Sequence, residues 1–215
     1  MAGMSVLPES TSPDDAVPGT STVPVWARIE QAWRALSALR RMMVGVGVAG
    51  GLGIAVAAAR LVPVSSAVAI GAVSLFAGAA AVVDVHEHRI PNRLLGMSLL
   101  MVAIAAVMGG VDTTADVTIG LLIGSVPLFV VRYGKGVGLG DVKFAAVLGA
   151  AGGLLHPGVG LVAVWAAALT SGLFVLTSDR TRLALAPWLW AGYVTACAAG
   201  VAMVQMGGVA WPARF

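Results

Sequence analysis

The chain has 215 residues, of which 59% are hydrophobic and only 11% are charged. A soluble domain usually carries about 25% charged residues, so this composition excludes an ordinary soluble protein and indicates several membrane-spanning segments. The net charge of +3 gives no argument for a nucleic-acid partner, because the basic residues lie between apolar runs.

The N-terminal part of the chain precedes the first long apolar run. Residues 1–24 are polar and rich in Pro, Ser and Thr, which predicts a disordered tail. This stretch also lacks the positively charged start and apolar run of a typical secretory signal peptide. Residues 25–41, "VWARIEQAWRALSALRR", repeat apolar residues at three- or four-residue steps with arginines between them. This pattern predicts an amphipathic helix that lies on the membrane surface or, alternatively, docks on protein.

Seven apolar segments follow, each about the length of a membrane span or slightly shorter. They cover roughly residues 42–60, 62–83, 94–110, 117–131, 142–155, 159–177 and 186–207. Their lengths and their lack of two-residue alternation favour helices over barrel strands. The sequence therefore predicts an all-α polytopic transmembrane bundle, with 42–60 as an extra N-terminal helix and 62–207 as the main membrane domain. Small-residue runs such as "VGVGVAGGLG" and "AGAAA" predict close helix packing, and the short fifth segment suits a helix that begins inside a wet cavity.

The basic residues are distributed unevenly between the two sides of the predicted bundle. If the tail is cytoplasmic, the loops after the second, fourth and sixth spans are cytoplasmic too, and that side holds eleven of the 13 Lys and Arg residues. Only Arg60 and Arg214 fall outside, together with Asp112 and Asp116. Because cytoplasmic loops carry the excess of positive charge, we expect a cytoplasmic (inner) membrane protein with its N-terminus inside and its C-terminus outside.

Two aspartates lie at the cytoplasmic edge of these spans. Asp84 ends the second span in "AAAVVDVHEHRIPNRLLG", and Asp141 opens the fifth in "GVGLGDVKFAAVLGA". A carboxylate at membrane depth is costly and indicates function, although either aspartate alone could simply cap a helix in the headgroup region. Two carboxylates held close together share a proton, so one can take a proton from water while the other donates one to a peptide carbonyl. That is the chemistry of an aspartic protease, which needs no metal and no cofactor.

The surroundings of the two aspartates differ. The glycines before Asp141 permit unusual backbone angles and the close approach of a substrate backbone, although such a stretch alone could be a flexible loop. Asp141 lies at a helix N-terminus, where the helix dipole favours the anion, whereas Asp84 lies at a helix C-terminus, where it favours the neutral acid. This effect of about 1 kcal/mol makes Asp141 the expected base and Asp84 the expected proton donor, unless neighbouring groups reverse the order.

These residues resemble the motifs of the type IV prepilin peptidase family, membrane aspartyl proteases of the GxGD type. The similarity extends over roughly residues 62–207 and comprises an Asp followed by "IPN", the stretch "GLGDVK" and a proline-containing last helix, "APWLWAGYV". The corresponding residues are Asp84, Ile90, Pro91 and Asn92 for the first motif, Gly138, Gly140, Asp141 and Lys143 for the second, and Pro187 for the last helix.

The resemblance implies an endopeptidase that cleaves the leader of prepilin-like precursors at the cytoplasmic face, just before the apolar helix of the leader. It implies Asp84 and Asp141 as the catalytic dyad and Gly138 and Gly140 as the active-site loop. Lys143 is either a substrate contact or a cation anchored at the interface. The expected partners are precursor peptides and membrane lipid. Bifunctional members of the family carry paired CxxC motifs and also N-methylate the product. This chain has one cysteine, so it resembles the short, peptidase-only type that serves Flp/Tad-like pili or archaellin-like substrates.

Several alternatives stay open. Asp84, His86 and His88 could be drawn as metal ligands, but no further ligand set is evident, so no metal is expected and His88 is expected at most to tune the site. A proton-coupled transporter would also use two membrane carboxylates, but the spans show no clear inverted repeat and both carboxylates lie at one edge. A non-catalytic assembly factor would have no reason to keep both aspartates within both motifs.

Two further residues and the N-terminal segment lie outside these motifs. His156, which precedes Pro157, is expected to be a turn residue, and Cys197 is expected to be a small buried apolar residue. A single cysteine also excludes an intrachain disulfide and a CxxC zinc site. Residues 1–60 lie outside the resemblance and are expected to serve anchoring, regulation or partner docking.

Overall fold

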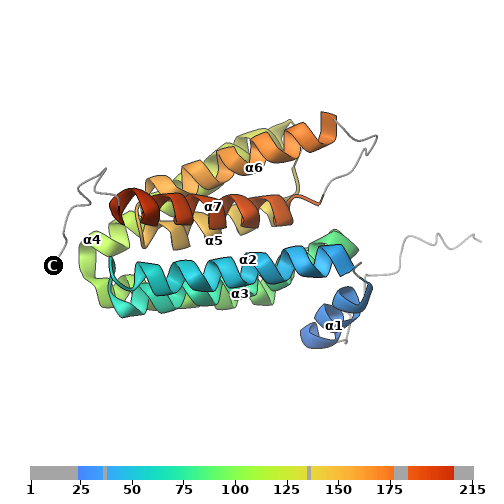
Figure 1. Ribbon diagram of the computed structural model, residues 1–215. Helices are drawn as coiled ribbons and strands as arrows, with labels where there is room; N and C mark the ends of the chain where they lie inside the picture. Colours follow the sequence, from blue (N-terminus) through green and yellow to red (C-terminus); the bar gives the residue numbers. More distant parts are fainter. Residues whose placement is uncertain (1–23, 36–37, 135–136, 177–183, 206–215) are drawn as a thin grey trace, which may run out of the picture.

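The computed structural model describes residues 24–35, 38–134, 137–176 and 184–205, and every regular element within these ranges is an α-helix. The helices are α1 (Val25–Ala35), α2 (Ala38–Ala58), α3 (Val64–Glu87), α4 (Asn92–Tyr133), α5 (Leu139–Gly153), α6 (Gly158–Leu176) and α7 (Ala186–Gln205). Figure 1 shows a bundle of elongated helices, with α1 beside the end at which α2 begins. The predicted all-α fold is confirmed. The predicted tail lies outside the described residues except for Pro24.

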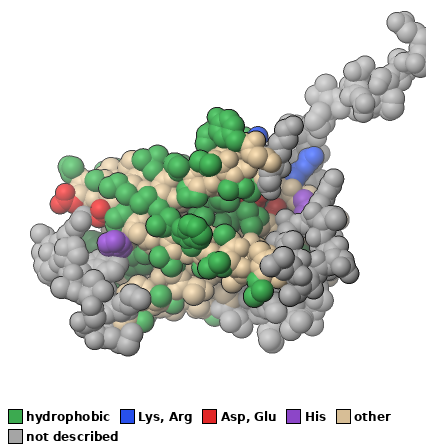
Figure 2. All heavy atoms as spheres, turned by 90° about the horizontal axis from the view of Figure 1, so that it is seen from above, with side chains coloured by type: hydrophobic (Ala, Val, Ile, Leu, Met, Phe, Trp, Pro, Cys, Tyr) green, Lys and Arg blue, Asp and Glu red, His purple; other side chains and the backbone are tan. Residues whose placement is uncertain are grey.

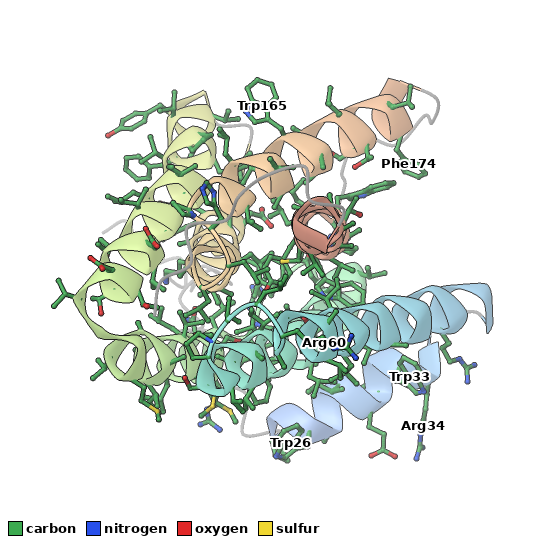
Figure 3. The ribbon with its side chains drawn as sticks, turned by 60° about the vertical axis from the view of Figure 1, so that its left-hand side comes forward. Trp26, Trp33, Arg34, Arg60, Trp165 and Phe174 are labelled. Atoms are coloured by element: carbon green, nitrogen blue, oxygen red, sulfur yellow. The ribbon has the colours of Figure 1, made fainter. Side chains whose placement is uncertain are left out.

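The predicted amphipathic helix, residues 25–41, is shorter in the structure than expected. α1 ends at Ala35, and Arg40 and Arg41 belong to the first turn of α2 rather than to the amphipathic helix. Ile29 packs against the hydrophobic core, and α1 contacts α3. Trp26 and Trp33 remain exposed and project from α1 in Figure 3. One face of α1 therefore docks on protein, as the alternative interpretation held, while its aromatic side chains stay outside.

A bend at Gly110 divides α4 into the two predicted spans 94–110 and 117–131. The 42 residues of α4 would extend about 63 Å if straight, roughly twice the apolar thickness of a bilayer. Gly110 has φ 86° and ψ −169°, a conformation open essentially only to glycine. The two limbs meet at a sharp angle (Figure 3). Asp112 and Asp116, which lie between the two predicted apolar segments, are in helical backbone of the second limb.

Threonine hydroxyls bind the backbone carbonyls that the bend exposes. Thr114 Oγ1 donates to the carbonyl oxygens of Gly110 (2.9 Å) and Ala106 (3.2 Å), and Thr113 Oγ1 donates to that of Gly109 (2.9 Å). A carbonyl left unpaired where little water reaches it is costly, so these hydroxyls help the chain to reverse direction between the two spans. The turn needs no separate loop.

Small residues bring the helix backbones close together, as the glycine-rich runs predict. A Cβ on Gly124 of α4 would lie 2.7 Å from the Ala145 carbonyl oxygen and 2.9 Å from the Gly149 Cα of α5. On α2, a Cβ on Gly51 would lie 2.5 Å from Ser74 Cβ of α3. Only a residue without a side chain fits at these contacts, which fixes the position of α5 against the second limb of α4.

The outside of the bundle is apolar between two charged ends. Side chains such as Val107, Val111 and Leu169 are 75%, 85% and 68% exposed, and Trp165 points away from the bundle (Figure 3). In the space-filling view, green covers the middle of the molecule and the charged side chains lie mostly near its two ends (Figure 2). Exposed apolar surface of this extent marks a protein that meets a membrane rather than water.

The lengths and compositions of individual helices also indicate a membrane protein. Val64–Val85 and Asn92–Tyr133 are long and apolar enough to cross a membrane, and Gly47–Ala58 and Gly158–Phe174 are shorter apolar stretches. The seven predicted apolar segments correspond to α2, α3, the two limbs of α4, α5, α6 and α7. The fold is therefore a helical membrane bundle. α5 is the short member, at 15 residues or about 22 Å.

Candidate active site

Asp84 lies in the last turn of α3, where it is buried with 5% of its surface exposed. The helix ends at Glu87, and His88 closes it in the left-handed conformation (φ 50°, ψ 36°), donating its N–H to the Asp84 carbonyl oxygen at 2.9 Å. The Asp84 side chain turns toward a distant part of the chain. Its Oδ2 accepts a hydrogen bond of 3.2 Å from the N–H of Ala186, the first residue of α7.

The start of α7 provides this donor because its other first-turn amides are already paired or absent. Trp188 and Leu189 donate to the carbonyl oxygen of Leu185, both at 3.1 Å, and Pro187 has no N–H. The Ala186 N–H is thus the one orphan amide of that turn that needs an acceptor from elsewhere. Proline at the start of a helix was the sequence signal that a helix N-terminus lies here, but nothing in the sequence indicated that it faces Asp84.

Asp141 lies in the first turn of α5, as predicted. Gly138 caps the helix with an extended backbone (φ −72°, ψ 152°), and Asp141 Oδ2 accepts a hydrogen bond from the Gly138 N–H at 3.3 Å. A Cβ on Gly138 would lie 3.1 Å from the same oxygen, so the absence of a side chain leaves room for the carboxylate. The carboxyl is half-buried, and most of the α5 residues that follow it are buried, with Lys143 an exposed exception.

The bundle brings the two aspartates together. α3 and α5 are in contact, and the Asp84 and Asp141 carboxyls are near enough for the charge of one to act on the other. The pair is formed by a helix that ends and a helix that begins at the same end of the molecule.

The remaining residues of the two motifs form the walls beside this pair. Ile90 is half-buried against the core, and its side chain lies 3.8 Å from where a Cβ on Gly140 would be. Pro91 is buried and caps α4, while Asn92 begins that helix with an exposed side chain. The first motif therefore packs directly against the second.

Two expectations about the glycines differ from the structure. Gly138 and Gly140 are not a free loop, because Gly138 is the cap of α5 and Gly140 lies in its first turn. Neither has a positive φ, and among the described glycines only Gly110 has one. Gly138 approaches the Asp141 carboxylate closely, whereas a Cβ on Gly140 would meet Ile90 at an ordinary contact distance of 3.8 Å. Lys143 follows on α5 with an exposed side chain, and Pro187 lies half-buried in the first turn of α7.

The histidines and the cysteine lie in different surroundings. His88 is exposed, and its imidazole is close enough to Asp84 to interact electrostatically. No three His, Cys, Asp or Glu side chains among the described residues are grouped so that they could hold a metal, and the His86 side chain lies outside that part. His156 Nδ1 accepts the Gly158 N–H at 3.0 Å in the turn between α5 and α6, and Cys197 is fully buried, both as predicted.

The helix-end argument for the roles of the two aspartates does not hold for Asp84. Its backbone is at a helix C-terminus, but its carboxyl receives the N–H at the start of α7, where the dipole favours an anion. Asp141 receives the equivalent donor at the start of α5. Both carboxyls therefore face a helix N-terminus, so the dipoles no longer distinguish a base from a proton donor.

The fold and this pair define a helical membrane protein with a two-carboxylate site at one end of its bundle. Residues 71–176 match the type IV leader peptidase family. That part of the chain contains both aspartates and both motifs, so the resemblance predicted from the sequence is confirmed. The match ends before α7, so the similarity of residues 186–194 to the last helix of the family stays a prediction. No curated protein and no solved structure was found to match the chain.

Proposed function

We propose that this protein is a membrane-embedded aspartyl endopeptidase that removes the leader of type IV prepilin-like precursors at the cytoplasmic face of the membrane. The family supports a leader peptidase activity in general. The observation that carries the specific mechanism is the pairing of Asp84 and Asp141, each within its motif, at the junction of α3 and α5.

In the proposed reaction the dyad holds one proton. The ionised carboxylate takes a proton from a water molecule, which attacks the peptide carbonyl, while the protonated partner donates to the carbonyl oxygen. The carboxyl that took the water proton then gives it to the leaving nitrogen, while the other carboxylate takes a proton from a hydroxyl of the tetrahedral intermediate. The C–N bond breaks, the leader and the new N-terminus are released, and the dyad again holds one proton. The Ala186 and Gly138 amides hold the two carboxyls in place. No metal, cofactor or thiol takes part in this scheme.

The proposed setting follows from charge and length. We place the N-terminus and the dyad on the cytoplasmic side and the C-terminus outside, because eleven of the 13 basic residues fall on the dyad's side. We assign the short, peptidase-only type, without methyltransferase activity, because the chain holds one cysteine and α3 joins α4 through only residues 88–91. An Flp/Tad-like pilin is the substrate class that this type serves.

Cleavage of a pilin-like precursor by Asp→Asn variants tests the proposal. Asp84→Asn and Asp141→Asn should each lower kcat by roughly a thousand-fold or more, and the double variant should be no worse, because the pair acts as a unit. Asp112→Asn, at an exposed position on the second limb of α4, is the matched control and should cleave normally. Strong residual cleavage by either dyad variant, with normal membrane insertion, would refute the two-aspartate mechanism.

A further inference from the structure

The N-terminal helix α2 lies outside the segment that matches the family, yet it packs on the two helices that meet at Asp84. It contacts both α3 and α7. A Cβ on Gly50 would lie 3.6 Å from Val194 of α7. A Cβ on Gly71 of α3 would lie 3.2 Å from Ala55 of α2. The extra helix α2 therefore packs against both α3 and α7.

One side chain of α7, Trp190, is inserted between the other two helices. A Cβ on Gly47 of α2 would lie 2.8 Å from Trp190 Cζ3, and a Cβ on Gly78 of α3 would lie 3.1 Å from Trp190 Cζ2. Trp190 is 5% exposed, and its Nε1 has no hydrogen-bond partner among the described atoms. The indole ring is thus held by packing, in a slot that is open because Gly47 and Gly78 have no side chains.

Trp190 lies one helical turn after Ala186, the residue whose N–H binds Asp84. The rigid indole ring is held one turn away from Ala186. It therefore fixes where the first turn of α7 lies along the helix axis and how that turn is rotated about the axis. A hydrogen bond of 3.2 Å weakens steeply if the donor moves by a fraction of an ångström or turns away.

We propose that α2 is a brace for the catalytic dyad, in which the Gly47–Trp190 contact holds the start of α7 so that the Ala186 N–H positions the Asp84 carboxyl. Trp190 is a positioning residue in this scheme, since it acts through Ala186 and touches no reacting atom. The catalytic consequence rests on the proposed function, whereas the structural link from Gly47 to Asp84 does not. This proposal gives α2 a specific role, whereas the sequence indicates only anchoring, regulation or partner docking for residues 1–60.

The slot allows a test with a matched pair of substitutions on one helix. Gly47→Ala places a methyl group against the Trp190 ring, whereas Gly45→Ala adds the same group two residues earlier, where nothing lies within 4 Å. We expect Gly47→Ala to lower kcat about 5- to 20-fold with little change in KM, and Gly45→Ala to behave as wild type. Replacing the indole by the smaller ring in Gly47→Ala/Trp190→Phe makes room for the methyl group and should recover most of the loss.

Two further measurements separate positioning from a general loss of folding. The acid limb of the pH–kcat profile should move to higher pH in Gly47→Ala, because a carboxylate that loses an N–H donor ionises less readily. Amide hydrogen exchange in residues 184–190 should be faster in Gly47→Ala than in Gly45→Ala, and this readout does not depend on protease activity. Rapid exchange with an unchanged kcat and pH profile would overturn the catalytic role alone.

Equal exchange, kcat and pH profile in Gly47→Ala and Gly45→Ala would overturn the brace itself. A loss of activity in both variants to the same degree would also contradict it, since only one of them meets Trp190. Failure of the proposed function looks different: the wild-type protein would then cleave no precursor, while the difference in hydrogen exchange between the two glycine variants would persist.

Discussion

The contact between the second limb of α4 and α5 is sensitive to a single methyl group. Gly124→Ala would place its Cβ 2.7 Å from the Ala145 carbonyl oxygen and 2.9 Å from Gly149 Cα. Both are backbone atoms of α5, so no side chain can rotate away to relieve the overlap. The two helices must instead separate by about half an ångström along a close-packed interface, and such overpacking costs about 1–3 kcal/mol.

A control on the same helix isolates this cost. Gly96→Ala adds its methyl group where nothing lies within 4 Å, so it should gain only the preference of alanine for helix, about 0.5–1 kcal/mol. Gly124→Ala gains the same amount, and the two variants should therefore differ by about 1–3 kcal/mol. For a chain of this size that difference corresponds to about 2–12 °C in melting temperature.

Thermal unfolding of both variants in detergent, followed by intrinsic fluorescence, measures the difference. Gly124→Ala should melt below Gly96→Ala, and its cleavage rate should fall as well, because α5 carries Asp141. Equal melting temperatures would contradict this prediction, since they would mean that α4 and α5 are not packed backbone to backbone at Gly124.

The remaining predictions concern topology, the N-terminus and the chemistry. Reporter fusions at Gly136 and Asp112 should land on opposite sides of the membrane, because the excess of basic residues orients the chain; the topology is falsified if both report the same side. Deletion of residues 1–37, which removes α1 and leaves α2 whole, should keep peptide cleavage in detergent largely intact, and a total loss with the bundle still folded would assign α1 to the site. Cys197→Ala and chelators should leave the cleavage rate unchanged, whereas rescue of chelated enzyme by divalent metal would replace the aspartyl mechanism. His88→Ala should change the pH profile without abolishing cleavage, because this imidazole interacts with Asp84; an unchanged profile would show that it does not tune the dyad.

The sequence predicted those features that depend on local pattern. Apolar run length identified the helices, and the positions of Asp84 and Asp141 at a helix end and a helix start followed from where those runs stop and begin. The apolar runs predicted separate spans that end at residue 110 and begin at residue 117. The structure instead continues the helix after a bend at Gly110, where Thr114 Oγ1 donates to the carbonyl oxygens of Ala106 and Gly110.

The features that the sequence did not predict depend on contacts between distant segments. The bond from Ala186 to Asp84 joins residues 102 positions apart, and no periodicity or propensity encodes such a pairing. The small-residue runs predicted that helices approach closely, but not which ones. Gly45 and Gly47 read alike in the sequence, yet one faces open space and the other faces Trp190.

The hydrogen bond between Ala186 and Asp84 can form only late in the synthesis of the chain. A nascent chain that has just inserted α5 already contains both aspartates and both motifs, but the donor that holds Asp84 is more than thirty residues from being synthesised. The dyad therefore acquires its final geometry only when α7 enters the bundle. Ribosome-bound chains that stop short of α7 contain all of residues 71–176 but lack the N–H group that binds Asp84. Under the proposed function, we therefore expect precursor cleavage only from chains that include α7.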